Sequence, residues 1–278
     1  MITLCCAGEL IQSNMAPGTC RFVFLLLALI LSQSGWSVGE NNSDEIIQRS
    51  VNALKIDFEA SPKFDCLERD RVSGGTRTYE DTMILGSPYQ RLIAVNGKPL
   101  GPKESAEEQQ KLNNVRSERE AESPQERSQR IAKYEKEQKR DHAMMDEMAK
   151  AFEFRLAGET KLGAHDVYVL QATPRPGYQP PNMETQALTG MRGKLWIDKQ
   201  TFQWVRVEAE VVHPVSIEGF LARVEPGTHF ELEKAPVAPG VWLPTHFLMR
   251  SRAKIFFLFP KNGQEDDTYF SYHKRTSD

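Results

Sequence analysis

The sequence has few cysteines, no excess of charge of one sign and no long hydrophobic run. Its four cysteines are Cys5, Cys6, Cys20 and Cys66 in a chain of 278 residues. Once an N-terminal leader is removed, Cys66 stands alone, so neither an intramolecular disulfide nor a zinc site of paired cysteines can form. We interpret Cys66 as a small buried hydrophobic residue. The 35 Lys and Arg residues against 38 Asp and Glu give a net charge of −3. This balance argues against a nucleic-acid-binding protein, which needs a basic excess or patch.

The longest hydrophobic run covers ten residues, Phe22–Leu31. A membrane-spanning helix needs about 20. The run follows Arg21 and precedes several small residues, which is typical of a secretory signal peptide. We expect a leader over residues 1–37, cleaved between residues 34 and 39, with Met15 as a candidate true start. The alternative is an uncleaved anchor. The chain is therefore expected in the periplasm, with at most transient membrane contact.

Compact catalytic motifs are absent from the sequence. It contains no Gly-x-Ser-x-Gly, His-Glu-x-x-His, Gly-x-Gly-x-x-Gly or phosphate-loop pattern. His142 and Asp146 are spaced to share a helix face, but a metal site usually needs three or four ligands. Glu208 and Glu210 fit the polar face of a strand better than a general acid/base pair. We expect no enzyme activity, metal or cofactor; a hydrolase built from distant residues is a third alternative.

The first part of the mature chain reads as a helix followed by short strands. Five apolar residues at three- and four-residue spacings predict an amphipathic helix over residues 42–58, with Ser43 as a candidate N-cap. The apolar residues are Ile46, Ile47, Val51, Leu54 and Phe58. Strands are predicted over residues 64–72, 76–85 and 89–95. Asn96-Gly97 is a strong signal for a two-residue hairpin turn.

Residues 103–150 are rich in charge of both signs. They contain 11 basic and 12 acidic residues, and Tyr134 is their one aromatic residue. Ser105–Glu108 and Ser123–Glu126 match the capping-box pattern, and Pro124 suits the first position of a helix. The sequence predicts helices at about 105–121 and 124–151, forming a charged helical hairpin inserted at 103–151. Such charged faces are usually solvated. The alternative is an arm that docks a partner.

The rest of the chain alternates apolar and polar residues, which predicts strands with one buried face. The fold class expected for residues 43–278 is a single α+β domain, mainly β, with an antiparallel sheet. One strand pairing can be specified: Leu195 opposite Val205 and Trp196 opposite Trp204, with a loop of three residues, Lys199–Thr201. This register places the aliphatic residues of both strands on one face.

The apolar face of this sheet is the candidate ligand site. It is plain core if helices cover it entirely, and it lines a groove for an apolar ligand if the sheet curls. The candidate ligand-binding residues are Phe154, Leu156, Val167, Val169, Leu195, Ile197, Val205, Val207, Phe247, Met249, Ile255 and Phe257.

Two neighbouring segments carry a resemblance to a known family. Gly193–Lys199 (GKLWIDK) followed by Phe202–Val207 (FQWVRV), with Gly219-Phe220 and Trp242–Pro244 further on, resembles the outer-membrane lipoprotein-sorting, LolA/LolB-like superfamily. The resemblance implies a curved, incompletely closed antiparallel half-barrel, with helices over a hydrophobic cavity. It covers residues 43–95 and 152–273, while the charged insertion departs from the family pattern.

The best-known members of that superfamily carry acylated lipoproteins across the periplasm. The resemblance therefore implies an exported, non-enzymatic carrier that binds a lipid acyl chain or a lipoprotein on the apolar face. The alternative function, from a different class, is an envelope protein-interaction or stress-sensing scaffold that docks a protein partner through the charged helical hairpin.

Overall fold

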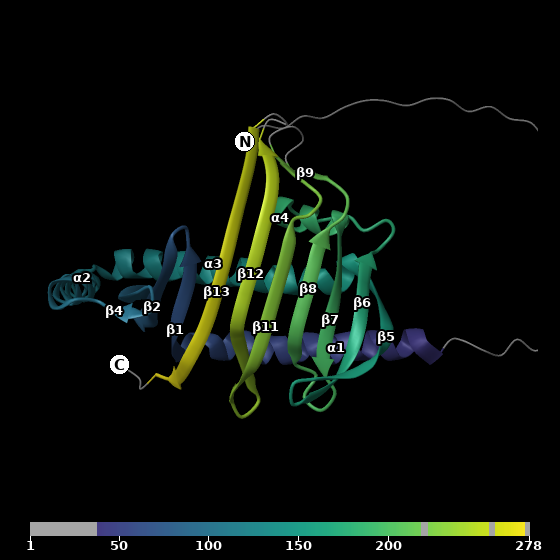
Figure 1. Ribbon diagram of the computed structural model, residues 1–278, viewed down its shortest axis with the longest axis horizontal. Coiled ribbons are helices and arrows are strands. Elements are labelled where there is room, and N and C mark those ends of the chain that lie inside the picture. The colour runs from purple at the N-terminus through teal and green to yellow at the C-terminus, as the bar shows by residue number, and fades with distance from the viewer. Residues whose placement is uncertain (1–37, 218–221, 256–258, 276–278) are drawn as a thin grey trace, which may run out of the picture. The chain divides into compact units, whose positions relative to one another are not determined.

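The computed structural model describes residues 38–217, 222–255 and 259–275 (Figure 1). The predicted signal peptide, residues 1–37, lies outside the described residues. In chain order the elements are α1 (Val38–Ala60), η1 (Ser61–Lys63), β1 (Phe64–Val72), β2 (Gly75–Ile84), β3 (Ser87–Val95), β4 (Lys98–Pro99), α2 (Pro102–Ala121), α3 (Pro124–Ala151), β5 (Phe152–Leu162), β6 (His165–Pro174), α4 (Met183–Gln186), η2 (Ala187–Gly190), β7 (Met191–Asp198), β8 (Trp204–Val211), β9 (Val215–Ile217), β10 (Ala222–Val224), β11 (His229–Ala238), β12 (Val241–Ile255) and β13 (Phe259–Lys274). None of the described helices combines the length and the apolar character needed to cross a membrane.

The strands form one antiparallel sheet of 13 strands. The main path runs in the order β4-β3-β2-β1-β13-β12-β11-β8-β7-β6-β5, and β9 and β10 attach beside β12. The two edges are β4 and β5, and no ladder joins them within the described part of the chain. The fold is therefore an α+β, mainly β, unclosed half-barrel with an N-terminal helix and a helical region (Figure 1).

The first three strands lie where the sequence predicts them. The turn between β3 and β4 consists of Asn96 and Gly97, whose φ angles are 52° and 73°. Two successive positive φ angles are the backbone of a type I′ hairpin turn, which matches the twist of the flanking strands. The predicted Asn-Gly hairpin is confirmed.

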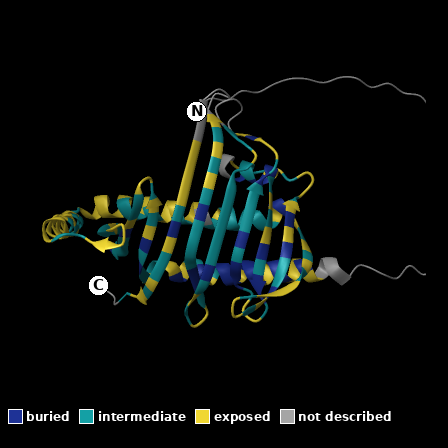
Figure 2. Ribbon diagram, viewed as in Figure 1, coloured by how far each residue is buried: buried dark blue, intermediate teal, exposed yellow. Residues whose placement is uncertain are grey.

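Helix α1 packs along one side of the sheet, which we call the inner face. Ile46, Ile47, Val51 and Leu54 of α1 belong to the main hydrophobic core together with residues of β5 to β8. Figure 2 shows buried residues along α1 and in the strands that cross it. The helix begins at Val38, earlier than predicted, so Ser43 is not an N-cap. Instead its Oγ accepts a hydrogen bond of 3.1 Å from the backbone N–H of Leu156 on β5.

The two predicted helices of the insertion are present. Ser123 caps α3 as predicted: its Oγ accepts from the N–H of Glu126, and its own N–H donates to the Glu126 carboxylate. Helix α2 begins earlier than the predicted cap at Ser105. Its N-cap is Gly101, whose N–H donates to the carboxylate of Glu104. The helix can begin here because Pro102 suits the first helical position.

The two helices of the insertion have different surroundings. Met144, Met148 and Ala149 of α3 pack against the main core, whereas α2 has no buried residue. Figure 1 views α2 nearly end-on while α3 crosses the picture, so the helices form a corner and not the expected antiparallel hairpin. The corner is fixed because Arg119 and Arg130 both bind the turn between β2 and β3.

The predicted pairing of β7 with β8 is wrong by two residues. Leu195 lies opposite Val207, and Trp196 lies opposite Arg206. A bulge after Trp196 then brings Ile197 opposite Trp204, so the connecting loop is longer than three residues. The bulge turns the Trp204 ring toward α1, where its Nε1–H donates to the Oγ of Ser50 at 3.2 Å. This contact with a distant helix has no counterpart in the local sequence pattern.

Candidate binding face and acidic cluster

Part of the predicted apolar face is closed by α1. Leu195, Ile197 and Val207 lie on the inner face with exposed fractions of 6%, 0% and 6%. All three belong to the core cluster that contains the apolar residues of α1. These three candidate ligand residues are therefore packed against the protein's own helix.

Three other candidate residues lie on the opposite, outer face of the sheet. Val169 pairs with Trp196, and Val167 pairs with Asp198, so both point away from Leu195 and Ile197. Val167 and Val205 form a separate small core with Trp242. The prediction that they share the face of Leu195 is thus corrected. Two features of the pairing explain the difference. The register of β6 with β7 places Val167 and Val169 on the outer face. The bulge after Trp196 shifts the alternation of β8, so that Val205 also lies on the outer face.

The remaining described candidates lie at the margin of the inner core. Phe154 and Leu156 of β5 pack against the core as partly buried residues. Phe247 and Met249 of β12 are also half-buried and lie opposite Leu232 and Phe230 of β11. Ile255 is the last residue of β12, and Phe257 lies outside the described residues.

Four half-buried apolar residues form a compact group on the inner face, which we call the β11–β12 patch. Its members are Phe230, Leu232, Phe247 and Met249. The Phe230 and Phe247 rings meet edge to face with centroids 5.4 Å apart. The β8 side of this group is filled by core residues. The patch combines the predicted Phe247 and Met249 with Phe230 and Leu232, and it stays half-exposed, as do Phe154 and Leu156 of β5.

Beside the patch, β1 and β13 bring acidic residues together. Asp267 lies opposite Phe247 on one side and Asp70 on the other. Glu68, Asp70 and Asp267, which we call the acidic cluster, each offer a carboxylate oxygen, and these oxygens all lie within 4.8 Å of one another. Glu68 and Asp267 are only 9% and 5% exposed.

Burial and nearby negative charges raise the pKa values of Glu68 and Asp267. Burial, a carboxyl–carboxyl hydrogen bond with Asp81 and the negative charges nearby raise the pKa of Glu68 to about 9. Burial and the charges of Asp70 and Glu265 raise the pKa of Asp267 to about 7. Cys66 lies at the edge of the same region. Burial, then the charges of Asp81 and Glu68, raise its thiol pKa to about 12, so it fits the expected buried hydrophobic residue and not a reactive thiol.

Sequence reasoning did not find the acidic cluster. Its only local signal is the Glu68-x-Asp70 spacing, which places two carboxylates on one face of a strand. Asp267 joins them through the β1–β13 pairing, almost 200 residues later in the chain. His142 and Asp146, the pair considered from the sequence as metal ligands, lie on α3. Their side chains are 3.4 Å apart, and Asp146 also pairs with Lys55.

The other paired carboxylates have cationic partners. Glu208 pairs with Arg206 at 2.7 Å and Glu210 with Arg192 at 3.5 Å, so both are half-buried members of ion pairs on the polar side of their strand. His165 hydrogen bonds to Asp198 at 3.2 Å and its ring contacts Trp242. Within the described residues, no serine hydroxyl is hydrogen-bonded to this His165–Asp198 pair.

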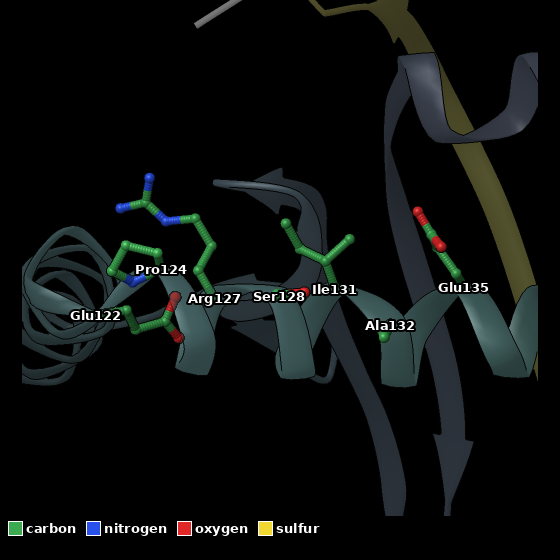
Figure 3. Close-up of a pocket in the computed structure, with 7 residues that line it drawn as sticks. All are labelled: Glu122, Pro124, Arg127, Ser128, Ile131, Ala132 and Glu135. Carbon is green, nitrogen blue, oxygen red and sulfur yellow. The ribbon is translucent and has the colours of Figure 1, made fainter.

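Two pockets lie away from the inner face. An open pocket of about 570 Å³ occupies the corner of α2 and α3 (Figure 3), and it is lined by Glu122, Pro124, Arg127, Ser128, Ile131, Ala132 and Glu135. A second, of about 490 Å³, is lined largely by polar residues of β6, β7 and β8 with His229 of β11. Neither pocket is lined by the β11–β12 patch.

Comparisons with known proteins gave structural likenesses only. Searches against protein-family models and curated proteins gave no match. Among solved structures, a domain assigned to outer membrane lipoprotein sorting, from Vibrio parahaemolyticus, is similar over 85% of this chain and 94% of its own, with a TM-score of 0.31 and 11% identity. A DUF1329 family protein from Desulfovibrio piger covers 84% of this chain and 92% of its own, with a TM-score of 0.30 and 10% identity.

A third similar structure is the complex of MucA and MucB from Pseudomonas aeruginosa. It matches over 85% of this chain and 100% of its own, with a TM-score of 0.25 and 10% identity. At such TM-scores the likeness carries no inference about what this chain binds.

Proposed function

We propose that the chain is a non-enzymatic binding protein that takes an acyl chain, or the acylated end of a lipoprotein, on the β11–β12 patch. The observation that carries this proposal is the half-exposed state of Phe230, Leu232, Phe247 and Met249 beside a core that is otherwise filled by α1. A hydrocarbon chain gains about 0.8 kcal/mol for each methylene group that it buries. Apolar contacts with these four side chains can therefore supply affinity without a charged contact.

The experiment measures lipid binding by two methods. Native mass spectrometry of protein extracted from its host should show bound lipid, and a fluorescent fatty acid should bind to the delipidated protein. Met249→Glu and Phe247→Glu should each weaken fatty-acid binding by about tenfold or more, because one charge against the chain costs at least 1.4 kcal/mol. Ile56→Glu is the matched control, since Ile56 is an apolar residue of α1 that is 56% exposed. Absence of lipid together with absence of fatty-acid binding would contradict the proposal, as would equal losses in the control.

The proposed location is the periplasm, reached by cleavage of a signal peptide. Helix α1 begins at Val38, so cleavage between residues 34 and 39 would leave the packed part of the helix intact. N-terminal sequencing of protein from the host envelope tests this proposal. A mature chain that begins before residue 30 would contradict it.

A second candidate function is docking of a protein partner through the insertion. It is favoured by α2, which has no buried residue yet is held firmly by Arg119. Since α3 contributes to the main core, the discriminating deletion is α2 alone, residues 102–121. A lipid carrier should keep fatty-acid binding after this deletion, whereas a docking protein should lose its partner in a pull-down from the host envelope.

A further inference from the structure

We propose that the chain binds the surface of an anionic phospholipid bilayer through four cations at one end of the sheet. These four residues, which we call the cationic strip, are Arg223, Arg250, Arg252 and Lys254. Strand β12 is paired with β11 only as far as Arg250, which lies opposite His229. Beyond that point β12 continues between β13 and β10 and projects past β11 (Figure 1). The strip therefore lies on a projecting end of the sheet.

Strand alternation places the three β12 members of the strip on one face. Arg250, Arg252 and Lys254 occur at every second residue, so they share the outer face, opposite to that of Met249, and span about 14 Å along the strand. All three are exposed. Arg223 of β10 lies opposite Lys254 and is half-buried. The four positive charges therefore face the same side.

The strands beside the strip place little negative charge against it. Arg250 lies between His229 and Gln264, and Arg252 lies beside Asn262. In the described ladders, no acidic residue lies opposite any member of the strip. The cations are therefore not neutralised across the sheet.

One carboxylate, that of Glu225, pairs with the strip. Its Oε1 lies 3.3 Å from the Nε of Arg223 and 3.4 Å from the Nζ of Lys254. Within the described ranges, no ion pair joins Arg250 or Arg252 to a carboxylate. One carboxylate against four cations leaves three positive charges uncompensated.

Two arginines elsewhere on the outer face show the contrast. Arg206 contacts the carboxylates of three glutamates, and Arg71 pairs with Asp266 at 3.0 Å. The exposed Glu265 is near the strip in sequence pairing, but it lies opposite Met249 and so belongs to the inner face. An anion that approaches the strip from the outer side thus meets mainly positive charge.

The loop between β10 and β11 fixes the position of Arg252. The Arg252 N–H donates to the Oγ1 of Thr228 at 3.0 Å, and its carbonyl accepts from the N–H of Glu225 at 2.8 Å. A Cβ at Gly227 would lie 3.0 Å from the Arg252 Nη1, so the guanidinium lies close against the backbone of this loop. Its remaining donors suit a phosphate, because guanidinium groups match phosphate oxygens in geometry and charge.

A phospholipid surface fits the strip better than an acidic protein does. Its phosphates form a layer of separate charges, which suits cations spread along a strand. The adjoining sequence is also apolar: Phe256-Phe257-Leu258 follows β12, and Phe220-Leu221 precedes β10. Lys and Arg combined with Phe and Leu are typical of segments that bind membrane surfaces. These apolar residues lie outside the described ranges, and the proposal needs only the strip.

The test is co-sedimentation of the mature chain with lipid vesicles. Vesicles that contain phosphatidylglycerol should bind the chain, and vesicles of phosphatidylcholine alone should bind it at least tenfold more weakly, because each cation near an anionic membrane adds roughly fivefold to the partition coefficient. Raising NaCl from about 0.1 M to about 1 M shortens the Debye length from about 10 Å to about 3 Å, so it should release the chain.

The double variant Arg250→Gln with Arg252→Gln should lower the partition coefficient about tenfold or more, since it removes two exposed charges from the strip. The matched control is Arg155→Gln with Lys194→Gln. It removes two exposed cations from the outer face of β5 and β7, on either side of Gln171. The control should bind like the unaltered chain. Lys254→Gln is a further single variant, with an expected loss of roughly fivefold.

This proposal can fail independently of the acyl-chain site. The double variant should keep fatty-acid binding, and Phe247→Glu should keep vesicle binding. No binding to phosphatidylglycerol vesicles would overturn the proposal, as would equal losses in the double variant and its control. Binding to a polyglutamate peptide without binding to vesicles would overturn it in favour of an acidic protein partner.

Discussion

Asp57 of α1 and Lys234 of β11 form a buried ion pair in which the Asp57 Oδ2 and the Lys234 Nζ lie 2.5 Å apart. Both side chains are about 95% buried, with exposed fractions of 5% and 6%. The other oxygen of Asp57 accepts from the backbone N–H of Trp242 and from the side-chain amide of Gln203. One carboxylate thus joins α1 to β11, to β12 and to the β7–β8 loop.

The first prediction concerns this pair. Burial raises the pKa of Asp57 and lowers that of Lys234, and their mutual attraction offsets only part of each shift. Removal of one partner leaves an unpaired buried charge, so Asp57→Asn or Lys234→Met should each cost about 3–5 kcal/mol of unfolding free energy. The double variant should cost less than the sum, because neither charge remains. Urea denaturation of the four proteins measures the coupling, and additive losses would contradict it.

The second prediction concerns the anchoring of the insertion. Arg130 donates to the carbonyl of Leu85 and to the Oγ of Ser87. Its Nε and Nη2 groups also donate to the two carboxylate oxygens of Glu122, which makes a bidentate ion pair. Arg130→Ala should raise amide hydrogen exchange in α2 and in the first turns of α3, while the global unfolding free energy falls by only about 1–2 kcal/mol.

Arg116→Ala is the control for this experiment, since Arg116 is an exposed arginine of α2. Its exchange pattern should match that of the unaltered chain. Unchanged exchange in Arg130→Ala would show that Arg119 and the packing of α3 hold the corner without Arg130.

The third prediction concerns Asp198, which closes the loop between β7 and β8. Burial alone would raise its pKa, but donors from the backbone and hydroxyl of Thr201, the N–H of Gln200 and the ring of His165 outweigh it and lower the pKa. Asp198→Ala should cost about 2 kcal/mol near neutral pH.

The same shift fixes how this cost depends on pH. A pKa that is lower in the folded chain gives stability that is present above the unfolded value, about 3.9 for Asp, and lost as the pH falls through the folded value. The difference in unfolding free energy between the unaltered chain and Asp198→Ala should therefore shrink below about pH 4. A difference that stays constant from pH 7 to pH 3 would mean that the carboxylate charge is not involved.

Local sequence signals located most of the elements. Ser123-x-x-Glu126 fixes the start of α3, and Asn96-Gly97 fixes a hairpin turn, because in each case the hydrogen bonds or backbone angles involve residues within one turn. The insertion at 103–151 was likewise visible as a change in composition. What the sequence could not give was the angle between its helices, which depends on arginine contacts with carbonyls more than 30 residues away.

The site itself was predicted only in part. The pairing of β7 with β8 failed because the bulge after Trp196 is stabilised by a hydrogen bond from Trp204 to Ser50, 154 residues away. That failure placed Val205 on the wrong face. Alternation identified strands with an apolar side, but it assigned Val167, Val169 and Val205 to the wrong face. It also could not tell which residues α1 covers, since coverage is a property of packing between distant elements.

The last prediction separates the core from the β11–β12 patch. Ile197 is fully buried against α1, so Ile197→Ala leaves a cavity and should lower the unfolding free energy by about 2–5 kcal/mol. Phe247→Ala removes a half-buried ring and should cost less stability. If the patch binds an acyl chain, the affinities should rank in the opposite way: the folded Ile197→Ala protein keeps the Kd of the unaltered chain, and Phe247→Ala binds more weakly. Urea denaturation and fatty-acid titration of the same two variants give both rankings. Weaker binding by Ile197→Ala with normal binding by Phe247→Ala would move the site under α1, where the ligand would have to displace the helix.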